Sequence, residues 1–230
     1  MFFNFTFRHF LMNPYRLAKN LKQSAIKGFW QRVTLVFLAS VLLFSLRSLW
    51  GINTENFTSF MTTSTADYTL ARYASLFGSV IWSVLYVAFH LFGVAYILSF
   101  IIGISFKKLL PMQLLMTALL LLEKTVIFAL FYFTGTATNL SFLSFGPLAS
   151  TYFELPFVIF FFNQLTITTA VIIAYQFSFI RTYGDMHKKY RLLLMLIGLH
   201  LFMAIFTASI GLLPVEDLFN KIVGGGAGNE

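Results

Sequence analysis

Long apolar runs constrain what this chain can fold into more than any other feature of its sequence. A helix needs about 20 apolar residues to cross the hydrocarbon core of a bilayer. Five runs of this kind extend over residues 30–50, 76–104, 110–133, 156–180 and 191–213. Because backbone polar groups must pair within the segment in lipid, each run is expected to be helical. The sequence therefore predicts an all-α polytopic integral membrane protein with a bundle of five transmembrane helices.

The composition supports this fold class and leaves no room for a separate soluble domain. Hydrophobic residues make up 58% of the chain and charged residues 10%, whereas a soluble domain is nearer half apolar and a quarter charged. We expect a basic cytoplasmic segment over residues 1–28, a transmembrane domain over residues 29–213, and a flexible, glycine-rich extracytoplasmic tail over residues 214–230.

Two segments are not expected to be simple perpendicular crossings. The run over residues 76–104 would extend roughly 43 Å at ~1.5 Å per residue, against a hydrocarbon core of ~30 Å. It must tilt, bend near Gly93 or project beyond the membrane. The segment over residues 134–155 contains several Phe and Leu residues and one acid, Glu154. Part of it is expected to lie on the membrane surface.

The distribution of Lys and Arg predicts the orientation, because cytoplasmic loops are enriched in these residues. The net charge is +8, and twelve of the basic residues fall on one side of a five-span arrangement. They are Arg8, Arg16, Lys19, Lys22, Lys27, Arg32, Lys107, Lys108, Arg181, Lys188, Lys189 and Arg191. The other side receives Arg47, Arg72 and Lys221. We expect a cytoplasmic N-terminus, an extracytoplasmic C-terminus and contact with anionic lipid, and no nucleic-acid partner.

A basic amphipathic helix is expected before the first span. Asn13 and Pro14 suit a helix start, and a helix from Pro14 to Lys27 would place Leu17, Ala18, Leu21 and Ala25 on one face. The proposed lipid-surface residues are Arg16, Lys19, Lys22 and Lys27. Such a helix is expected to lie on the inner leaflet; the alternative is a soluble, partly frayed leader.

Six polar residues interrupt the predicted spans. They are His90, Glu123, Lys124, Asn163, Gln164 and His200. Ionisable residues at this depth usually face the bundle interior or a watery cavity. Neighbouring helical residues point about 100° apart, so Glu123 and Lys124 each need a partner on a different helix. This intramembrane polar seam has three interpretations: contacts that hold the helices together, a surface for a partner's transmembrane helix, or a proton or ion relay.

No catalytic motif accompanies these polar residues. The sequence contains no H-E-x-x-H pair, no phosphate-binding glycine loop and no G-x-S-x-G nucleophile elbow. The absence of cysteine excludes disulfides, thiolate metal sites and cysteine nucleophiles. We therefore expect a non-enzymatic protein without a metal or cofactor.

The layout resembles the YIP family, the Ypt/Rab-interacting membrane proteins and their bacterial relatives. Three local stretches are similar to the bacterial members: Phe10–Leu17 (FLMNPYRL), Ser105–Pro111 (SFKKLLP) and Ile180–Gly184 (IRTYG). The D-L-Y-G-P signature of the eukaryotic members is absent, and Thr182–Asp185 is only a distant counterpart. The likeness covers most of the chain and is one of layout more than of motif.

The resemblance implies a function that the residues alone do not. It implies an accessory or assembly factor in the cell membrane, working with the permease and membrane-fusion subunits of an ABC-type exporter in resistance to a peptide toxin. The alternative is a small stand-alone membrane transporter coupled to ions or protons. A proton or ion relay usually needs several carboxylates, and Glu123 is the one carboxylate deep in a predicted span.

Overall fold

The computed structural model describes residues 2–4, 7–51, 65–135, 140–184 and 188–212. In chain order, its elements are β1 (Phe2–Asn4), α1 (Phe7–Met12), α2 (Pro14–Gln23), β2 (Ala25–Lys27), α3 (Phe29–Leu49), α5 (Thr65–Ala88), the π-helix η2 (Phe89–Gly93), α6 (Val94–Ile102), α7 (Phe106–Thr134), α8 (Gly146–Tyr152), α9 (Pro156–Gln164), α10 (Ile167–Tyr183) and α11 (Lys189–Gly211). The expected tail over residues 214–230 lies outside the described residues.

Four helical segments are long and apolar enough to cross a membrane. They are Phe29–Leu49, Tyr68–Ile102, Phe106–Thr134 and Lys189–Gly211. The prediction of a mainly helical chain with membrane-length apolar helices is confirmed in this coarser form, which is compatible with a multi-pass membrane protein.

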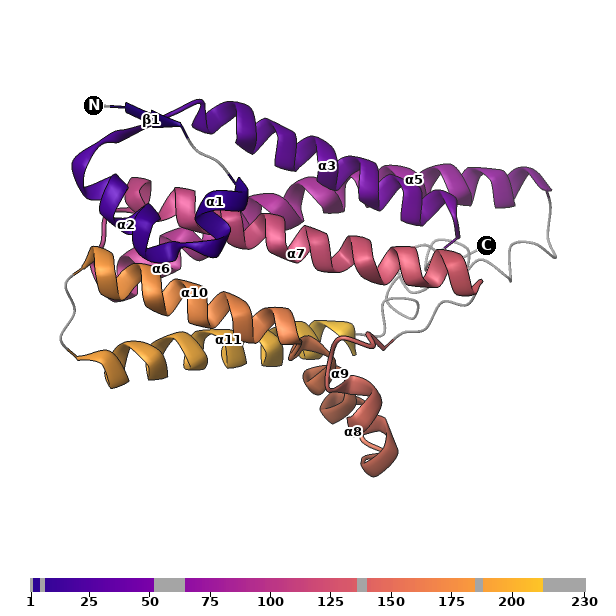
Figure 1. Cartoon of the computed structure of the whole chain (residues 1–230). Helices are drawn as coiled ribbons and strands as arrows, with labels where there is room; N and C mark the ends of the chain where they lie inside the picture. The colour runs from indigo at the N-terminus through magenta and orange to yellow at the C-terminus, as the bar shows by residue number, and fades with distance from the viewer. Residues whose placement is uncertain (1, 5–6, 52–64, 136–139, 185–187, 213–230) are drawn as a thin grey trace, which may run out of the picture.

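The fourth expected span differs from its prediction. The apolar run over residues 156–180 is not one helix, because it is interrupted at Leu165 and Thr166 between α9 and α10. α10 has 17 residues, which gives about 26 Å at ~1.5 Å per residue. It lies alongside the longer helices (Figure 1), while α9 leaves the bundle at an angle. The interruption has long-range causes, described below.

The second expected span is longer than predicted and is irregular near its middle. α5, η2 and α6 follow one another without a gap from Thr65 to Ile102. A π-turn widens the helix by one residue per turn and redirects the segment that follows. The turn ends at Gly93, where a Cβ atom would lie 3.1 Å from the ring of Phe89. Gly103 adopts a positive φ of 76° and ends α6, so that α7 can return along it.

α7 is the central helix of the arrangement. Figure 1 shows α3 and α5 side by side as one layer and α10 and α11 as another, with α7 between them. Its segment from Leu109 to Thr117 is buried throughout. In the α3–α5 pair, the Ser40 hydroxyl donates to the Ser83 carbonyl at 3.3 Å, and small residues of this kind let two helices approach closely.

The N-terminal segment packs against the bundle. α2 ends at Gln23, earlier than the expected end at Lys27, because Ala25–Lys27 forms β2 and pairs in parallel with β1. Leu17, Ala18 and Leu21 share one face of α2, as expected, and are 0–4% exposed. That face contacts α10 and α7. The protein itself covers the surface that was expected to enter the lipid.

One end of the bundle carries most of the exposed cations, and we call it the basic end. It comprises α2, the start of α7, the last turn of α10 and the start of α11, which lie together on the left of Figure 1. Its exposed basic residues include Arg16, Lys19, Lys22, Lys107, Arg181, Lys189 and Arg191. Arg72, by contrast, donates to the Leu49 carbonyl near the opposite end. The segregation of charge in the sequence is therefore also a segregation in space.

Candidate functional site

A chain of hydrogen bonds joins three helices through the middle of the bundle. The Gln176 side-chain amide of α10 donates through Nε2 to Oε1 of Gln113 on α7, at 3.2 Å. Oε1 of Gln176 lies 3.1 Å from Nε2 of His200 on α11. Because this amide oxygen only accepts, Nε2 of His200 carries the proton. We call these three residues the amide chain.

The amide chain is buried, so its polar groups need hydrogen-bond partners within the protein. Gln113 is 2% exposed and Gln176 is fully buried, so an unpaired amide at either position would cost the full desolvation penalty. Among the described residues, no buried side-chain nitrogen or oxygen lacks a hydrogen-bond partner. The amide chain pairs both ends of the Gln176 side chain and joins α7, α10 and α11.

Sequence reasoning found one member of this chain, His200, and missed the other two. Gln113 lies near the beginning of the apolar run 110–133, and Gln176 lies near the end of the run 156–180. An amide near the end of a run is easily taken for an interfacial residue. The sequence feature that could have identified Gln113 and Gln176 is an uncharged amide inside each of two apolar runs.

A second group of polar residues, which we call the charge group, gathers around Glu123 and Lys124 of α7. It comprises Arg47, Tyr86, His90, Glu123 and Lys124. Lys124 interacts electrostatically with Glu123 and with Arg47 of α3, and Tyr86 of α5 interacts with the same two charges. In the described part of the chain, Glu123 and Lys124 form neither a hydrogen bond nor a salt bridge. The expected direct pairing of both charges with neighbouring helices is therefore not seen there.

Arg47 belongs to this group because its side chain leans toward the bundle interior. Side chains on a helix lean toward its N-terminus, which for the C-terminal turn of α3 means toward the bundle interior. The Arg47 guanidinium carbon lies 5.6 Å from the centre of the Phe44 ring, one turn earlier. Arg47 is half-buried as a result, although a position so near the helix end would also have allowed it to extend to the interface.

His90 connects the charge group with the amide chain. It lies in the π-helix η2, and its ring centre is 4.4 Å from that of Tyr86. Its electrostatic neighbours include both Lys124 and His200. Single π-turns often occur at functional sites, and here the π-turn carries the histidine that lies between the two polar groups.

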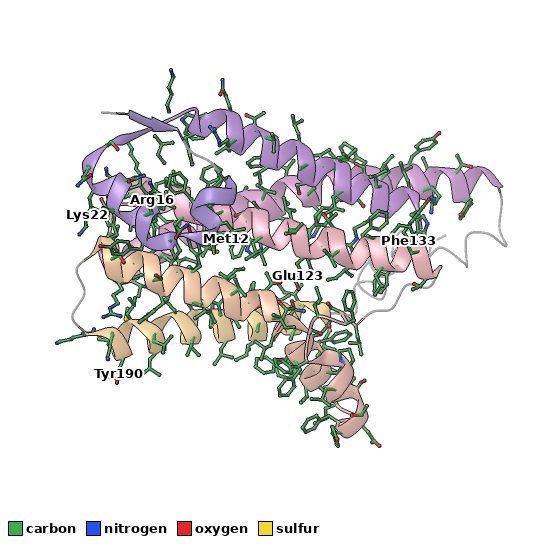
Figure 2. The ribbon with its side chains drawn as sticks, in the orientation of Figure 1. Met12, Arg16, Lys22, Glu123, Phe133 and Tyr190 are labelled. Carbon is green, nitrogen blue, oxygen red and sulfur yellow. The ribbon has the colours of Figure 1, made fainter. Side chains whose placement is uncertain are left out.

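Glu123 lies level with the beginning of α10. From the Gln113–Gln176 contact, ten residues along α7 lead to Glu123 (123 − 113), and ten residues back along α10 lead to Thr166 (176 − 166). The two helices run in opposite directions with the same rise per residue, so these positions share one depth, as Figure 2 shows for Glu123. The N-terminus of α10 therefore lies at the depth of this carboxylate.

Asn163 has a different environment from the rest of the predicted seam. Its side-chain oxygen accepts from the Ser141 backbone N–H and from the Ser144 hydroxyl, both at 2.8 Å. It thereby fastens α9 to the segment that precedes α8. The backbone carbonyl of Gln164, the last residue of α9, accepts a hydrogen bond from the Thr169 hydroxyl at 3.3 Å. The six predicted residues therefore do not form one continuous seam.

The chain itself pairs the backbone around the helix interruption. The Leu165 carbonyl accepts from the Phe145 N–H, and the Ile167 N–H donates to the Leu143 carbonyl, each at 3.1 Å. The side chains of Thr166 and Thr169 form a capping box at the start of α10. These contacts pair four backbone groups next to the interruption within the protein: the Leu165 carbonyl and the N–H groups of Thr166, Ile167 and Thr169.

The fold and the site together define a class: a helical, membrane-type bundle whose helices are joined by buried polar side chains. Within the described residues, no group of three or more His, Cys, Asp or Glu side chains is placed to hold a metal ion. Comparisons with family models, with curated proteins and with solved structures found no match to this chain.

Proposed function

We propose that this chain is a non-enzymatic integral membrane accessory subunit that assists assembly of an ABC-type exporter, one that protects the cell from a peptide toxin. Its partners would be the permease and membrane-fusion subunits of that exporter. We further propose that the protein lies in the cell membrane with its basic end in the cytoplasm, following the positive-inside rule. The exporter itself rests on the resemblance of the sequence to bacterial YIP proteins.

The observation that carries the accessory function is the state of the charge group. Arg47, Glu123 and Lys124 lie in membrane-length helices, yet within the described chain Glu123 and Lys124 have no hydrogen-bonded or ion-paired partner. The three side chains carry two positive charges and one negative charge when ionised. Charges at such depth are retained where something pairs with them. A partner's transmembrane helix that presents a carboxylate would balance this group.

Two further features favour an accessory role over transport. Transporters commonly use an interrupted helix, whose free backbone groups bind the substrate or ion. Here the Leu165 carbonyl and the Ile167 N–H are occupied by the segment that precedes α8. The amide chain is likewise paired end to end from Gln113 to His200. These groups serve the internal architecture.

A stand-alone ion- or proton-coupled transporter is the second candidate, and two observations favour it. The helix between residues 156 and 183 is interrupted next to Asn163 and Gln164. His90, in the π-turn, also has both Lys124 and His200 as electrostatic neighbours. A relay would have to use this histidine together with the single deep carboxylate, Glu123.

The decisive experiment is purification of the tagged protein from its native membrane in mild detergents, followed by mass spectrometry of the co-purifying proteins. We expect permease and membrane-fusion subunits in the wild-type eluate and a several-fold loss of both with Lys124→Met. Lys189→Met, at an exposed position of the basic end, is the matched control and should retain them. Recovery of the chain alone in every detergent would contradict the accessory function.

A reconstitution experiment separates the second candidate. Purified protein in sealed vesicles should show no proton-dependent flux above that of protein-free vesicles. Flux that depends on a proton gradient and is abolished by Glu123→Gln would establish the transporter and overturn the accessory proposal.

A further inference from the structure

Two short helices leave the bundle together at the end opposite the basic end. α8 and α9 contact each other along their length, and α9 also contacts α11. Figure 1 shows this pair directed away from the common axis of the long helices. We call the pair and its connection, residues 146–164, the paddle. Part of the segment over residues 134–155 was expected to lie on the membrane surface, and residues 156–164 were expected to begin a transmembrane helix.

The base of the paddle is fixed rigidly to the bundle. Asn163 holds the backbone at Ser141 and the hydroxyl of Ser144. Gly146 packs so closely on Asn163 that an added Cβ atom would lie 2.8 Å from its side-chain oxygen. Near the other end of α8, the rings of Phe153 and Phe162 stack with centres 6.1 Å apart. The direction of the paddle is therefore set by the fold.

The exposed surface of α8 divides into an apolar side and a hydroxyl-bearing side. Leu148 and Tyr152 are 58% and 77% exposed and lie one turn apart, on the same side of the helix. Ser150 is also exposed and lies on the opposite side, because it is two residues from each of them at about 100° per residue. Thr151, exposed as well, lies at the boundary between the two sides, about 60° from Leu148. Ala149 is buried. A helix with one apolar and one polar exposed side suits the boundary between membrane and water.

The length and charge of the paddle exclude deeper positions in the membrane. α8 and α9 have 7 and 9 residues, so each is only about 10–14 Å long at ~1.5 Å per residue. Neither helix can cross the bilayer. A hairpin inserted into the hydrocarbon would bury Glu154, which connects the two helices and is exposed, at a cost of several kcal/mol.

We propose that the paddle lies in the plane of the membrane–water interface, with Leu148 and Tyr152 toward the acyl chains, Ser150 toward water and Thr151 at the boundary between them. Its partner is therefore the lipid bilayer. An exposed tyrosine such as Tyr152 prefers this depth, because its ring is apolar and its hydroxyl is polar. Because the paddle continues directly into α10, this contact fixes the depth of the 17-residue helix, which is too short to tilt far. The proposal is independent of the exporter function.

The test measures the environment of the four α8 positions in lipid vesicles. The chain has no cysteine, so a nitroxide label can be attached at Leu148→Cys, Ser150→Cys, Thr151→Cys or Tyr152→Cys, one at a time. Collision rates with oxygen, which concentrates in lipid, and with a water-soluble nickel complex report the surroundings. We expect a several-fold higher oxygen-to-nickel ratio at residues 148 and 152 than at residue 150, with residue 151 intermediate. Leu194→Cys on α11, 69% exposed, is the lipid-facing reference.

Each other outcome overturns the proposal in a recognisable way. Four water-like positions would mean that the paddle projects into the aqueous phase. Four lipid-like positions would mean that it inserts into the hydrocarbon. Four positions shielded from both reagents would mean that protein covers the paddle, either a second copy of this chain or a partner subunit. Size-exclusion profiles of the labelled variants identify any that fail to fold.

Discussion

At the scale of single residues, buried amides contribute more to this molecule than its charges do. Gln176 uses both ends of its side chain, one toward Gln113 and one toward His200, while fully buried. Removing it would leave two partners on two other helices unsatisfied. Glu123 and Lys124, which stand out in the sequence, interact with their neighbours only electrostatically within the described chain. The two residues that are most conspicuous in the sequence, Glu123 and Lys124, are thus not the ones that hydrogen bonds hold in place.

Replacing Gln176 tests this ranking. Gln176→Leu removes two hydrogen bonds and should lower stability by about 1–3 kcal/mol, measured as a lower midpoint of thermal unfolding in detergent. Gln164→Leu is the matched control, because Gln164 lies outside the amide chain, and it should unfold near the wild-type temperature. Equal effects of the two substitutions would show that the amide chain contributes nothing beyond the volume of its side chains.

The adjacent charges call for a three-variant series. If Glu123 and Lys124 stabilise each other electrostatically, Glu123→Gln and Lys124→Met should each reduce the amount of protein in the membrane, since each leaves an uncompensated buried charge. The double variant should recover most of it, because replacing both charges is often near neutral. Membrane levels measured by immunoblot decide between these outcomes. Normal levels of every variant, combined with lost export, would assign the two charges to a partner.

At the scale of elements, α2 packs across the basic end and is held there by hydrogen bonds to α10 and α7. We call this arrangement the clasp. The Tyr175 hydroxyl of α10 donates to the Phe10 carbonyl at 2.7 Å in a buried position. The Lys108 ammonium of α7 donates to the Leu21 carbonyl at 3.2 Å, satisfying a carbonyl that the end of α2 leaves without a helical partner. Leu17 and Ala18 are buried against the bundle. Contact between α2 and lipid is therefore expected through its exposed basic face, which carries Arg16 and Lys22 (Figure 2).

Removing the Tyr175 hydroxyl should loosen this clasp. Tyr175→Phe removes one of the two donors to the Phe10 carbonyl and leaves the Asn13 N–H, at 3.2 Å, as the other. The loss of this hydrogen bond, about 1 kcal/mol, should speed tryptic cleavage after Arg16 and Lys19 in the folded protein. Tyr183→Phe, on the same helix but outside this contact, is the control. Cleavage at an unchanged rate in Tyr175→Phe would show that the apolar face alone holds α2 in place.

Contact with anionic lipid through α2 should depend on salt. The exposed basic residues Arg16 and Lys19 would contribute about 1 kcal/mol each near an anionic surface, and salt screens this attraction. Retention of anionic lipid by purified protein, measured by native mass spectrometry, should therefore fall in the Arg16→Gln, Lys19→Gln double variant and in high salt. Lys188→Gln, Lys189→Gln is the control with the same charge change. An equal loss in both pairs would indicate a diffuse effect of the basic end.

At the scale of the whole molecule, the layers and the charge distribution agree. α7 lies between the α3–α5 layer and the α10–α11 layer (Figure 1), and the exposed cations gather at one end. This arrangement makes a clear prediction for intact cells. A cysteine introduced at Ser141 should react with a membrane-impermeant thiol reagent from outside, whereas cysteines at Gln23 and Thr182 should react only after the membrane is opened. Labelling of Thr182 in sealed cells would reverse or break the proposed topology.

The sequence by itself determined that this chain forms membrane-length helices and that its cations gather on one side. Both are local properties: hydropathy is summed over about 20 residues, and charge is counted loop by loop. The interruption at Leu165 and Thr166 was not visible, because the backbone next to it pairs with Phe145 and Leu143, 20 and 24 residues earlier in the chain. Likewise, Gln113 meets Gln176 across 63 positions. Which polar side chains meet depends on the rotation and register of packed helices, and only the tertiary structure fixes these.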